Sequence, residues 1–321
     1  MHYYLSQRAI VDYVASHAIG ATMPNLNTSI LQKIPIILPL LPIQRKIAAV
    51  LSAYDDLIEN NNRRIALLEK MAEELYREWF VRLRFPGHEK VKIVKGVPEG
   101  WEMINAGKYF KLIKGKSYTS DEISDFQDTE NHLPFINLKN FNRGGGFRPD
   151  GIKYYSGKFN ESQVVQDNSI VLAVTDMTQD RAIIGRAARI PTGSMRKGII
   201  SCDVVKIDPV DISQSFLLAL LRYSSYSTSL KEFANGANVL HLKPELAAKQ
   251  KIIMPTTELR LKFDDVYKPI LKKVDACMNM QNFLTNTRDR LLSRLMSGKV
   301  NVEKMDIRFP ESMKEETVVN A

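Results

Sequence analysis

The sequence repeats itself along its length, and this repeat constrains the fold more than any other feature. Two twenty-residue segments, which begin at Gly20 and Gly236, align without a gap at an offset of 216 residues. The identical pairs are Gly20/Gly236, Ala21/Ala237, Leu26/Leu242, Lys33/Lys249, Ile36/Ile252, Ile37/Ile253 and Pro39/Pro255. One ungapped register over so many pairs indicates a duplicated structural unit. Two unrelated helical hairpins with similar apolar spacing are the alternative interpretation.

Each copy of the repeat leads into a long helix with a heptad seam, in which apolar residues recur at alternating steps of four and three. The first seam is Ile47, Leu51, Tyr54, Ile58, Asn61, Ile65, Leu68, Ala72, Leu75 and Trp79. The second is Phe263, Tyr267, Ile270, Val274, Cys277, Gln281, Leu284, Arg288, Leu291 and Leu295. The pattern predicts helices over about 43–84 and 259–297. Because each has a single apolar stripe to bury, we expect them to pack against each other, antiparallel, within one chain.

The segment between the helices has a different texture. Short β-rich runs alternate with turn residues from about Val97 onwards, and 212–233 is predicted as one helix. Before each long helix a short apolar strand ends at a proline, at 34–39 and again at 252–255. The predicted fold class is therefore α+β, with one mostly-β domain between two long helices that pair as an antiparallel coiled coil.

These patterns divide the chain into five predicted parts. They are a helical remnant of a first β-rich domain (1–19), a region with the first copy of the repeat and the first long helix (20–96), a complete β-rich domain (97–235), a region with the second copy and the second long helix (236–300), and a tail (301–321). Residues 1–19 align with 217–235 at the same offset, so we expect the chain to begin near the end of a first domain of this kind.

Composition limits the class of protein. The chain of 321 residues carries 45 Lys and Arg against 36 Asp and Glu, a net charge of +9 that favours a polyanionic partner. Two cysteines, Cys202 and Cys277, provide neither a disulfide framework nor a cysteine-based zinc site. The longest apolar run, 34–43, is interrupted by prolines and is too short to cross a bilayer. We expect no signal peptide and a cytoplasmic location.

Lysine, arginine and amide side chains on the predicted loops have the chemistry that grips phosphates and reads base edges. An ordinary solvated surface is the alternative interpretation for each of them. The candidate DNA-binding residues are Lys114, Lys116, Asn137, Lys139, Asn142, Arg143, Asp176, Gln179 and Arg181.

Motifs for catalysis are missing from the sequence. It contains no G-x-x-x-x-G-K-[ST] loop, and its five histidines have no metal-ligand spacing. Pro149-Asp150 has no later acidic residue with Lys two positions on, so a restriction-nuclease metal site cannot be assembled from that pattern. The Asn/Asp-Pro-Pro-aromatic motif of adenine methyltransferases is also absent. These absences predict a binding protein without catalytic residues and without a metal site.

Four stretches resemble the DNA-specificity subunit of type I restriction-modification systems. They are the strand-then-helix entry Ile36–Ile47, the helix end Tyr76–Gly87 with its Trp-Phe pair, the Pro98-Glu99-Gly100-Trp101 opening of the middle domain, and the segment Leu291–Val300. The 216-residue repeat matches the internal duplication of that family.

The resemblance implies sequence-specific DNA binding by target-recognition domains that two paired helices hold apart. It implies modification (methyltransferase) subunits that bind S-adenosylmethionine and methylate adenine, and a restriction subunit that uses ATP and Mg. No cofactor is then expected in this chain. A homodimer or a complementing half-subunit would supply a second recognition domain. The alternative function is a coiled-coil scaffold with a non-DNA protein-binding middle domain; an autonomous nuclease is the third hypothesis.

Overall fold

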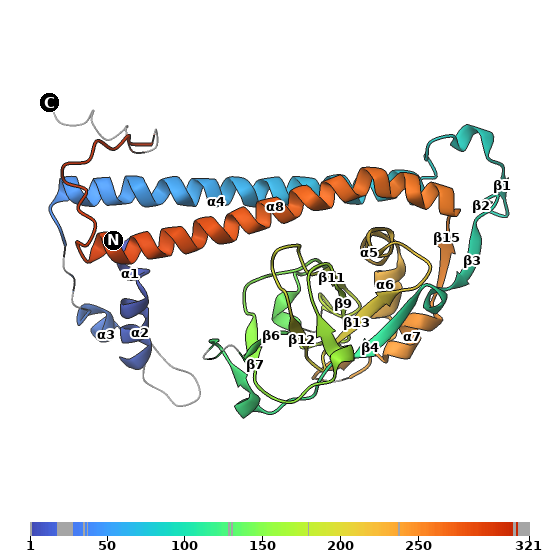
Figure 1. Ribbon diagram of the computed structural model, residues 1–321, viewed down its shortest axis with the longest axis horizontal. Helices are drawn as coiled ribbons and strands as arrows, with labels where there is room; N and C mark the ends of the chain where they lie inside the picture. Colours follow the sequence, from blue (N-terminus) through green and yellow to red (C-terminus); the bar gives the residue numbers. More distant parts are fainter. Residues whose placement is uncertain are drawn as a thin grey trace. The chain divides into compact units, whose positions relative to one another are not determined.

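The computed structural model has long helices and a β-rich middle segment (Figure 1), and it divides into two compact units. Unit 1 comprises Met1–Arg64 and Cys277–Ala321, and unit 2 comprises Ile65–Ala276. The structure describes residues 2–17, 28–34, 36, 38–127, 129, 131–178, 180–236, 238–310 and 313. The mixture of long helices and a β-rich middle confirms the predicted fold class.

Two long helices dominate the secondary structure, as the heptad pattern predicts. α4 spans Leu41–Tyr76 and continues into a π-helical turn, η1 (Arg77–Val81), while α8 spans Thr257–Met296. Subtracting the repeat offset of 216 from Thr257 gives Leu41, the first residue of α4. The preceding short helices obey the same offset, since α7 (Pro244–Lys249) corresponds to residues 28–33 and α3 spans Thr28–Gln32. The duplication seen in the sequence is therefore also a duplication of structure.

Unit 1 contains the N-terminal helices and one end of the helix pair. α1 (His2–Leu5) and α2 (Arg8–His17) precede α3. Ile47 and Leu51 near the start of α4 form one core cluster with Leu292 and Leu295 near the end of α8. The start of one helix packing on the end of the other makes the pair antiparallel.

Arg288 is a charged residue in the second seam, at a position where the heptad pattern calls for an apolar side chain. Its guanidinium donates to Asp55 Oδ1 at 2.7 Å, and the Tyr3 hydroxyl donates to Asp55 Oδ2 at 2.6 Å. The arginine is thus tolerated in the seam because its charge is paired with α4.

Unit 2 contains the β-rich domain and the other end of the helix pair. Its four-stranded sheet is antiparallel, and the order is β11 (Ala187–Arg189), β9 (Ile170–Ala173), β13 (Val204–Pro209) and β4 (Phe110–Lys114). A five-stranded sheet, mixed because β12 pairs with β6 in parallel, has the order β5 (Ile123–Ser124), β7 (Lys153–Tyr155), β6 (Leu133–Ile136), β12 (Gly198–Ile200) and β8 (Val164–Val165).

Three two-stranded pairs complete the described sheets: β1 (Ile93–Val94) with β2 (Val97–Pro98), β10 (Thr175–Asp176) with β14 (Leu240–His241), and β15 (Lys251–Met254) with β3 (Glu102–Asn105). β15 is the predicted strand before the second long helix, and it pairs antiparallel with a strand of the predicted middle domain. The compact unit therefore extends beyond 97–235 on both sides. The corresponding strand of the first copy includes positions 35 and 37, which lie outside the described residues.

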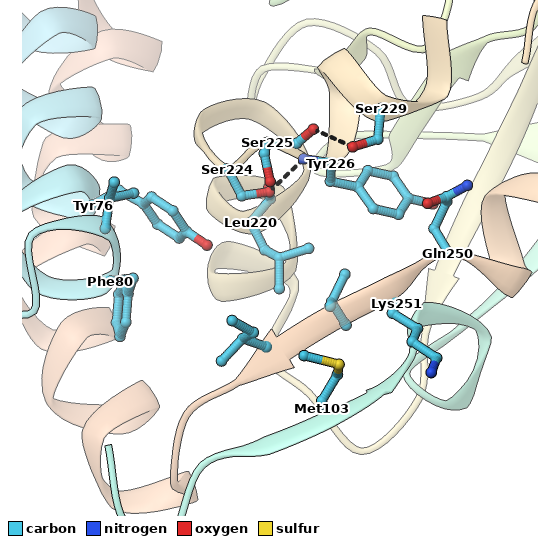
Figure 2. Close-up of a pocket in the computed structure, with 13 residues that line it drawn as sticks. Tyr76, Phe80, Met103, Leu220, Ser224, Ser225, Tyr226, Ser229, Gln250 and Lys251 are labelled. Carbon is cyan, nitrogen blue, oxygen red and sulfur yellow. Dashed lines mark hydrogen bonds between the residues drawn. The ribbon is translucent and has the colours of Figure 1, made fainter. Parts of the chain in front are cut away.

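The predicted single helix at 212–233 is wrong, because the structure has two helices there. α5 spans Gln214–Tyr223 and α6 spans Tyr226–Lys231, with Ser224 extended between them. The Ser224 hydroxyl accepts from the Tyr226 backbone N–H at 3.1 Å, and the Ser229 hydroxyl donates to the Ser225 carbonyl at 3.0 Å (Figure 2). Serine side chains that bond to the local backbone compete with continuous helix, and this serine-rich stretch bends the chain for that reason.

The predicted seam residues are all buried or half-buried. In unit 2, Leu68, Ala72 and Leu75 of α4 pack in the same core as Phe263, Tyr267 and Ile270 of α8, and α5 joins that core. The remaining predicted seam positions with low exposure are Tyr54, Ile58, Asn61, Ile65, Val274, Cys277, Gln281 and Leu284, together with Trp79, Leu291 and Leu295.

We predict that Leu51→Ala weakens unit 1, because the Leu51 side chain is fully buried in the helix-pair core. The cost of truncating such a leucine is about 2–5 kcal/mol of unfolding free energy. Leu57→Ala is the matched control, since Leu57 lies on the same helix and is 51% exposed; its cost should stay within about 0.5 kcal/mol. Urea titration followed by far-ultraviolet circular dichroism measures both. Equal losses of unfolding free energy in the two variants would contradict the assignment of Leu51 to the buried seam.

Candidate nucleic-acid interface

Several strands of unit 2 end at one shallow groove of about 380 Å³. Tyr118 follows β4, Asn137 and Lys139 follow β6, and Met177 follows β10. The rest of the lining comes from Ser120, Ile123, Phe135, Leu138, Lys153 and Asp203. Two of the candidate DNA-binding residues, Asn137 and Lys139, are thus brought together here.

Asn137 stabilises the loop at the groove through hydrogen bonds, while Lys139 is a solvent-exposed residue of that loop. The Asn137 side-chain oxygen accepts from the Lys139 backbone N–H at 2.9 Å, and Asn140 Oδ1 accepts from the Asn137 N–H, also at 2.9 Å. This reciprocal cap starts a single 3₁₀ turn, η5 (Leu138–Asn140). The Asn137 amide group donates to the Phe135 carbonyl at 3.3 Å. Lys139 is exposed, whereas Asn137 is half-buried and its side chain bonds within the loop.

Asn142 and Arg143 belong to a glycine-rich loop beside the loop at 176–181. Asn142 Nδ2 donates to the Phe147 carbonyl at 3.3 Å, and Arg143 forms an exposed ion pair with Asp180. The backbone N–H of Gly144 donates to the Ala182 carbonyl at 3.1 Å. Positive φ angles of 87°, 108° and 93° at residues 144–146 explain the run of glycines. The two predicted loops are therefore fastened to each other.

Asp176 is a buried organiser of its loop. Its Oδ1 accepts from the Thr178 N–H at 2.8 Å and the Thr178 hydroxyl at 2.7 Å, and its Oδ2 accepts from the N–H groups of Ile183 at 2.7 Å and Ile184 at 3.1 Å. Burial alone would raise the pKa of Asp176, but these hydrogen bonds favour the charged form and lower it. The Asp176 carboxylate therefore stabilises the backbone of the loop that follows it.

The remaining candidates differ in how much of their side chain is available. Arg181, with φ of 52°, donates to the Lys231 carbonyl at 3.0 Å. Lys114 is exposed and forms an ion pair with Glu245 at 2.8 Å. Lys116 is held through its backbone, since its N–H donates to the Ile200 carbonyl at 2.8 Å, and its side chain is half-exposed. Gln179 lies outside the described residues.

The groove also contains residues that the sequence interpretation missed, namely Tyr118, Lys153, Met177 and Asp203. Lys153 is paired with Asp125 at 3.1 Å. Met177 is 73% exposed, although it directly follows the buried Asp176. No periodicity in the sequence marks these residues, because the strands that bring them together are distant along the chain.

Among the described residues, no group of three or more His, Cys, Asp or Glu residues is arranged to hold a metal ion. None of the described helices is long and apolar enough to cross a membrane.

These features define a class of protein: a β-rich domain, with loops rich in lysine and amide groups, carried between two long antiparallel helices. Residues 1–70 match the family of type I restriction modification DNA specificity domains. The chain is 26% identical over 315 residues to the type I restriction enzyme MjaIX specificity subunit of Methanocaldococcus jannaschii, covering 95% of this chain and 69% of that protein.

Two further comparisons agree. A putative MjaX specificity subunit of the same organism is 24% identical over 304 residues, covering 94% of this chain and 67% of that protein. In fold, the chain is similar to a type I restriction-modification S subunit from M. genitalium, with a TM-score of 0.51, 18% identity and coverage of 88% of this chain and 69% of that one. Over most of its length the chain is therefore similar to type I restriction-modification specificity subunits.

We predict that Asp176→Asn destabilises unit 2 at neutral pH by about 1.5–3 kcal/mol, because charge-assisted hydrogen bonds are lost. The folded-state pKa of Asp176 is depressed, so its contribution is present above the ordinary value of 3.8 and is lost as pH falls through the lower folded value. The wild-type and variant free energies should therefore converge on acidification below pH 3.8.

Urea titrations followed by tryptophan fluorescence check this, because both tryptophans, Trp79 and Trp101, lie in unit 2. Asp150→Asn is the control, since Asp150 is exposed in a nearby loop. A constant difference between Asp176→Asn and the wild type across that pH range would contradict the assignment.

Proposed function

We propose that the groove and loops of unit 2 form the DNA-recognition face of this specificity subunit. In this proposal the long helices bind modification subunits, so that the sequence selected by unit 2 directs adenine methylation and restriction. The chain itself is a non-catalytic recognition subunit. S-adenosylmethionine, ATP and Mg belong to the modification and restriction subunits.

The observation that carries the proposal is the convergence of strand ends on one groove whose rim carries an exposed lysine. Lys139 and the half-exposed Lys116 supply donors for phosphates, which fix the position of a protein on a duplex. The paired loops at 142–146 and 176–181 add polar groups on a fixed backbone. A rigid polar face of this kind suits sequence reading, because a base contact requires a fixed geometry.

Exposed apolar side chains on the three N-terminal helices of unit 1 support a second recognition domain as a further partner. In unit 2, α6 packs on the β-rich domain: the Ser227 hydroxyl donates to the Gly185 carbonyl at 2.7 Å, and the Tyr226 hydroxyl donates to the Ala247 carbonyl at 2.9 Å. Positions that are fully buried in unit 2 correspond, at the offset of 216, to exposed apolar positions in unit 1. The pairs are Leu221 (0% exposed) with Leu5 (40%), Ser227 (1%) with Val11 (49%), and Ala247 (0%) with Leu31 (47%).

This contrast supports a β-rich recognition domain as the partner that covers these side chains of α1–α3, since the corresponding helices of unit 2 pack on such a domain. A complementing half-subunit or a second copy of the chain would supply it. Two identical domains related by a two-fold axis would read a palindrome with a spacer.

We predict that Lys139→Ala lowers the salt dependence of DNA binding. If Lys139 contacts one phosphate, the slope of log K against log salt becomes less steep by roughly 0.9. Lys92→Ala is the control, because Lys92 is exposed and lies outside the groove. Fluorescence-anisotropy titration of the assembled modification complex with its methylated site measures the slope. The scaffold function would be favoured instead if the wild-type complex bound duplex DNA no better at low salt than at high salt.

We predict that the amides of α2 become protected from hydrogen exchange when the chain is part of the complete restriction-modification complex. Val11→Asp should abolish this protection, because a charge would face the apolar surface of the occupant. Ala9→Asp is the matched control on the same helix, because its counterpart at the offset of 216, Ser225, is exposed in unit 2. Unchanged α2 exchange between the isolated chain and the complex would show that no domain covers this face.

A further inference from the structure

The groove of unit 2 has apolar walls and one carboxylate. These side chains could contact a base as well as a phosphate. Tyr118 is 40% exposed, and its ring meets the fully buried Phe135 edge-on at a centroid distance of 4.9 Å. Phe135 in turn stacks on the buried Tyr155 at 5.2 Å. Tyr118 is therefore held by an aromatic stack and presents a rigid, partly exposed face to the groove.

Met177 lines the groove together with Tyr118. Its side chain is 73% exposed, but its backbone follows Asp176, whose carboxylate accepts four hydrogen bonds. An exposed thioether on a fixed turn is an adaptable apolar contact that a ligand would cover favourably.

Asp203 supplies the polar end of the groove. Its Oδ1 accepts from the Thr175 hydroxyl at 2.8 Å, and its N–H donates to the Ser201 hydroxyl at 3.3 Å. The Ser201 hydroxyl lies 3.5 Å from Asp203 Oδ2. A carboxylate has about four acceptor positions, so these contacts orient Asp203 and leave it able to accept from a ligand. Burial, and to a lesser extent the nearby Asp203 carboxylate, raises the pKa of Tyr118. The Tyr118 hydroxyl therefore stays protonated and can donate a hydrogen bond.

The chemistry that fits is a base carrying an exocyclic amino group. The amino groups of cytosine N4 and adenine N6 donate in the major groove of DNA, and Asp or Glu is a carboxylate partner for such donors. Guanine O6 and thymine O4 are acceptors that a carboxylate repels. Lys139 at the rim provides the positive charge that brings the phosphate backbone close despite the carboxylate.

We propose that Asp203 determines base specificity in unit 2 by accepting a hydrogen bond from the amino group of one cytosine or adenine, while Tyr118 and Met177 contact that base or its neighbour. This inference rests on the proposed DNA-recognition function. It names residues outside the candidates that the sequence suggested.

The test is selection from a randomised duplex library by the assembled modification complex, followed by affinity titration of the selected sites. The wild type should require cytosine or adenine at one position. Asp203→Asn, which exchanges an acceptor oxygen for an amide donor, should lose at least roughly tenfold preference at that position alone, in keeping with the worth of one base contact. The base for which the preference is lost at that position shows whether Asp203 contacts cytosine or adenine.

Two variants complete the design. Asp208→Asn is the matched control, because Asp208 lies on β13, is paired with Lys206 at 3.4 Å and does not line the groove; its selected sequence should not change. Met177→Ala removes an exposed side chain, so it should fold even if Asp203→Asn does not, and it should weaken binding of the selected site several-fold.

The outcomes separate the two levels of the proposal. If the wild type selects a sequence and a folded Asp203→Asn selects the same sequence with the same affinity, the assignment of Asp203 is wrong and the DNA-recognition function stands. If Asp203→Asn does not fold and Met177→Ala binds like the wild type, the groove is not the reading site. If the wild-type complex selects no sequence, the proposed function itself fails.

Discussion

The junction of aromatic rings at the end of α4 is the interaction on which the rest of unit 2 depends. Phe80 lies 5.1 Å from Phe263 of α8 and 5.3 Å from Phe216 of α5, measured between ring centroids, and Trp79 lies 5.7 Å from Phe263. Edge-to-face contacts at these distances contribute beyond the burial of area. One cluster thus joins both long helices to α5, which packs on β11 of the four-stranded sheet.

Polar pairs around this junction set its orientation. Arg189 of β11 donates to Asp275 of α8 at 2.5 Å, and both side chains are less than a tenth exposed. Arg222 of α5 pairs with Glu69 of α4 at 3.0 Å. Buried ion pairs add little net stability, since desolvation offsets their attraction, but breaking one partner is costly. We infer that they hold the β-rich domain in one orientation on the helix ends.

The sequence predicted those parts of the fold whose signal is periodic. The heptad steps located both long helices to within a few residues at their starts, and the repeat offset reproduced the start of α4 from that of α8. The break at Ser224 was missed, because the apolar pattern runs on through a turn that serine hydroxyls stabilise. Arg189 illustrates a different limit: no pattern in the sequence indicates that its charge is buried against Asp275.

The candidate site was predictable only in outline. Loops after β4, β6 and β10 were recognisable by their lysines and amides, but Asp176 turned out to accept four hydrogen bonds within its own loop. Tyr118, Met177 and Asp203 come together from segments up to 85 positions apart through the pairing of β6 with β12 and of β13 with β9. Such a juxtaposition depends on strand order, and strand order is not readable from local residue patterns.

The most direct test of the central claim is to exchange the recognition segment and map where the host DNA is methylated. Residues 97–235 would be replaced by the corresponding segment of another specificity subunit whose methylated sequence is established, with both long helices retained. We expect that the complex still assembles and that the half of the methylated sequence read by this segment changes to that of the donor. Methylation that remains at the original sequence after the exchange would contradict it.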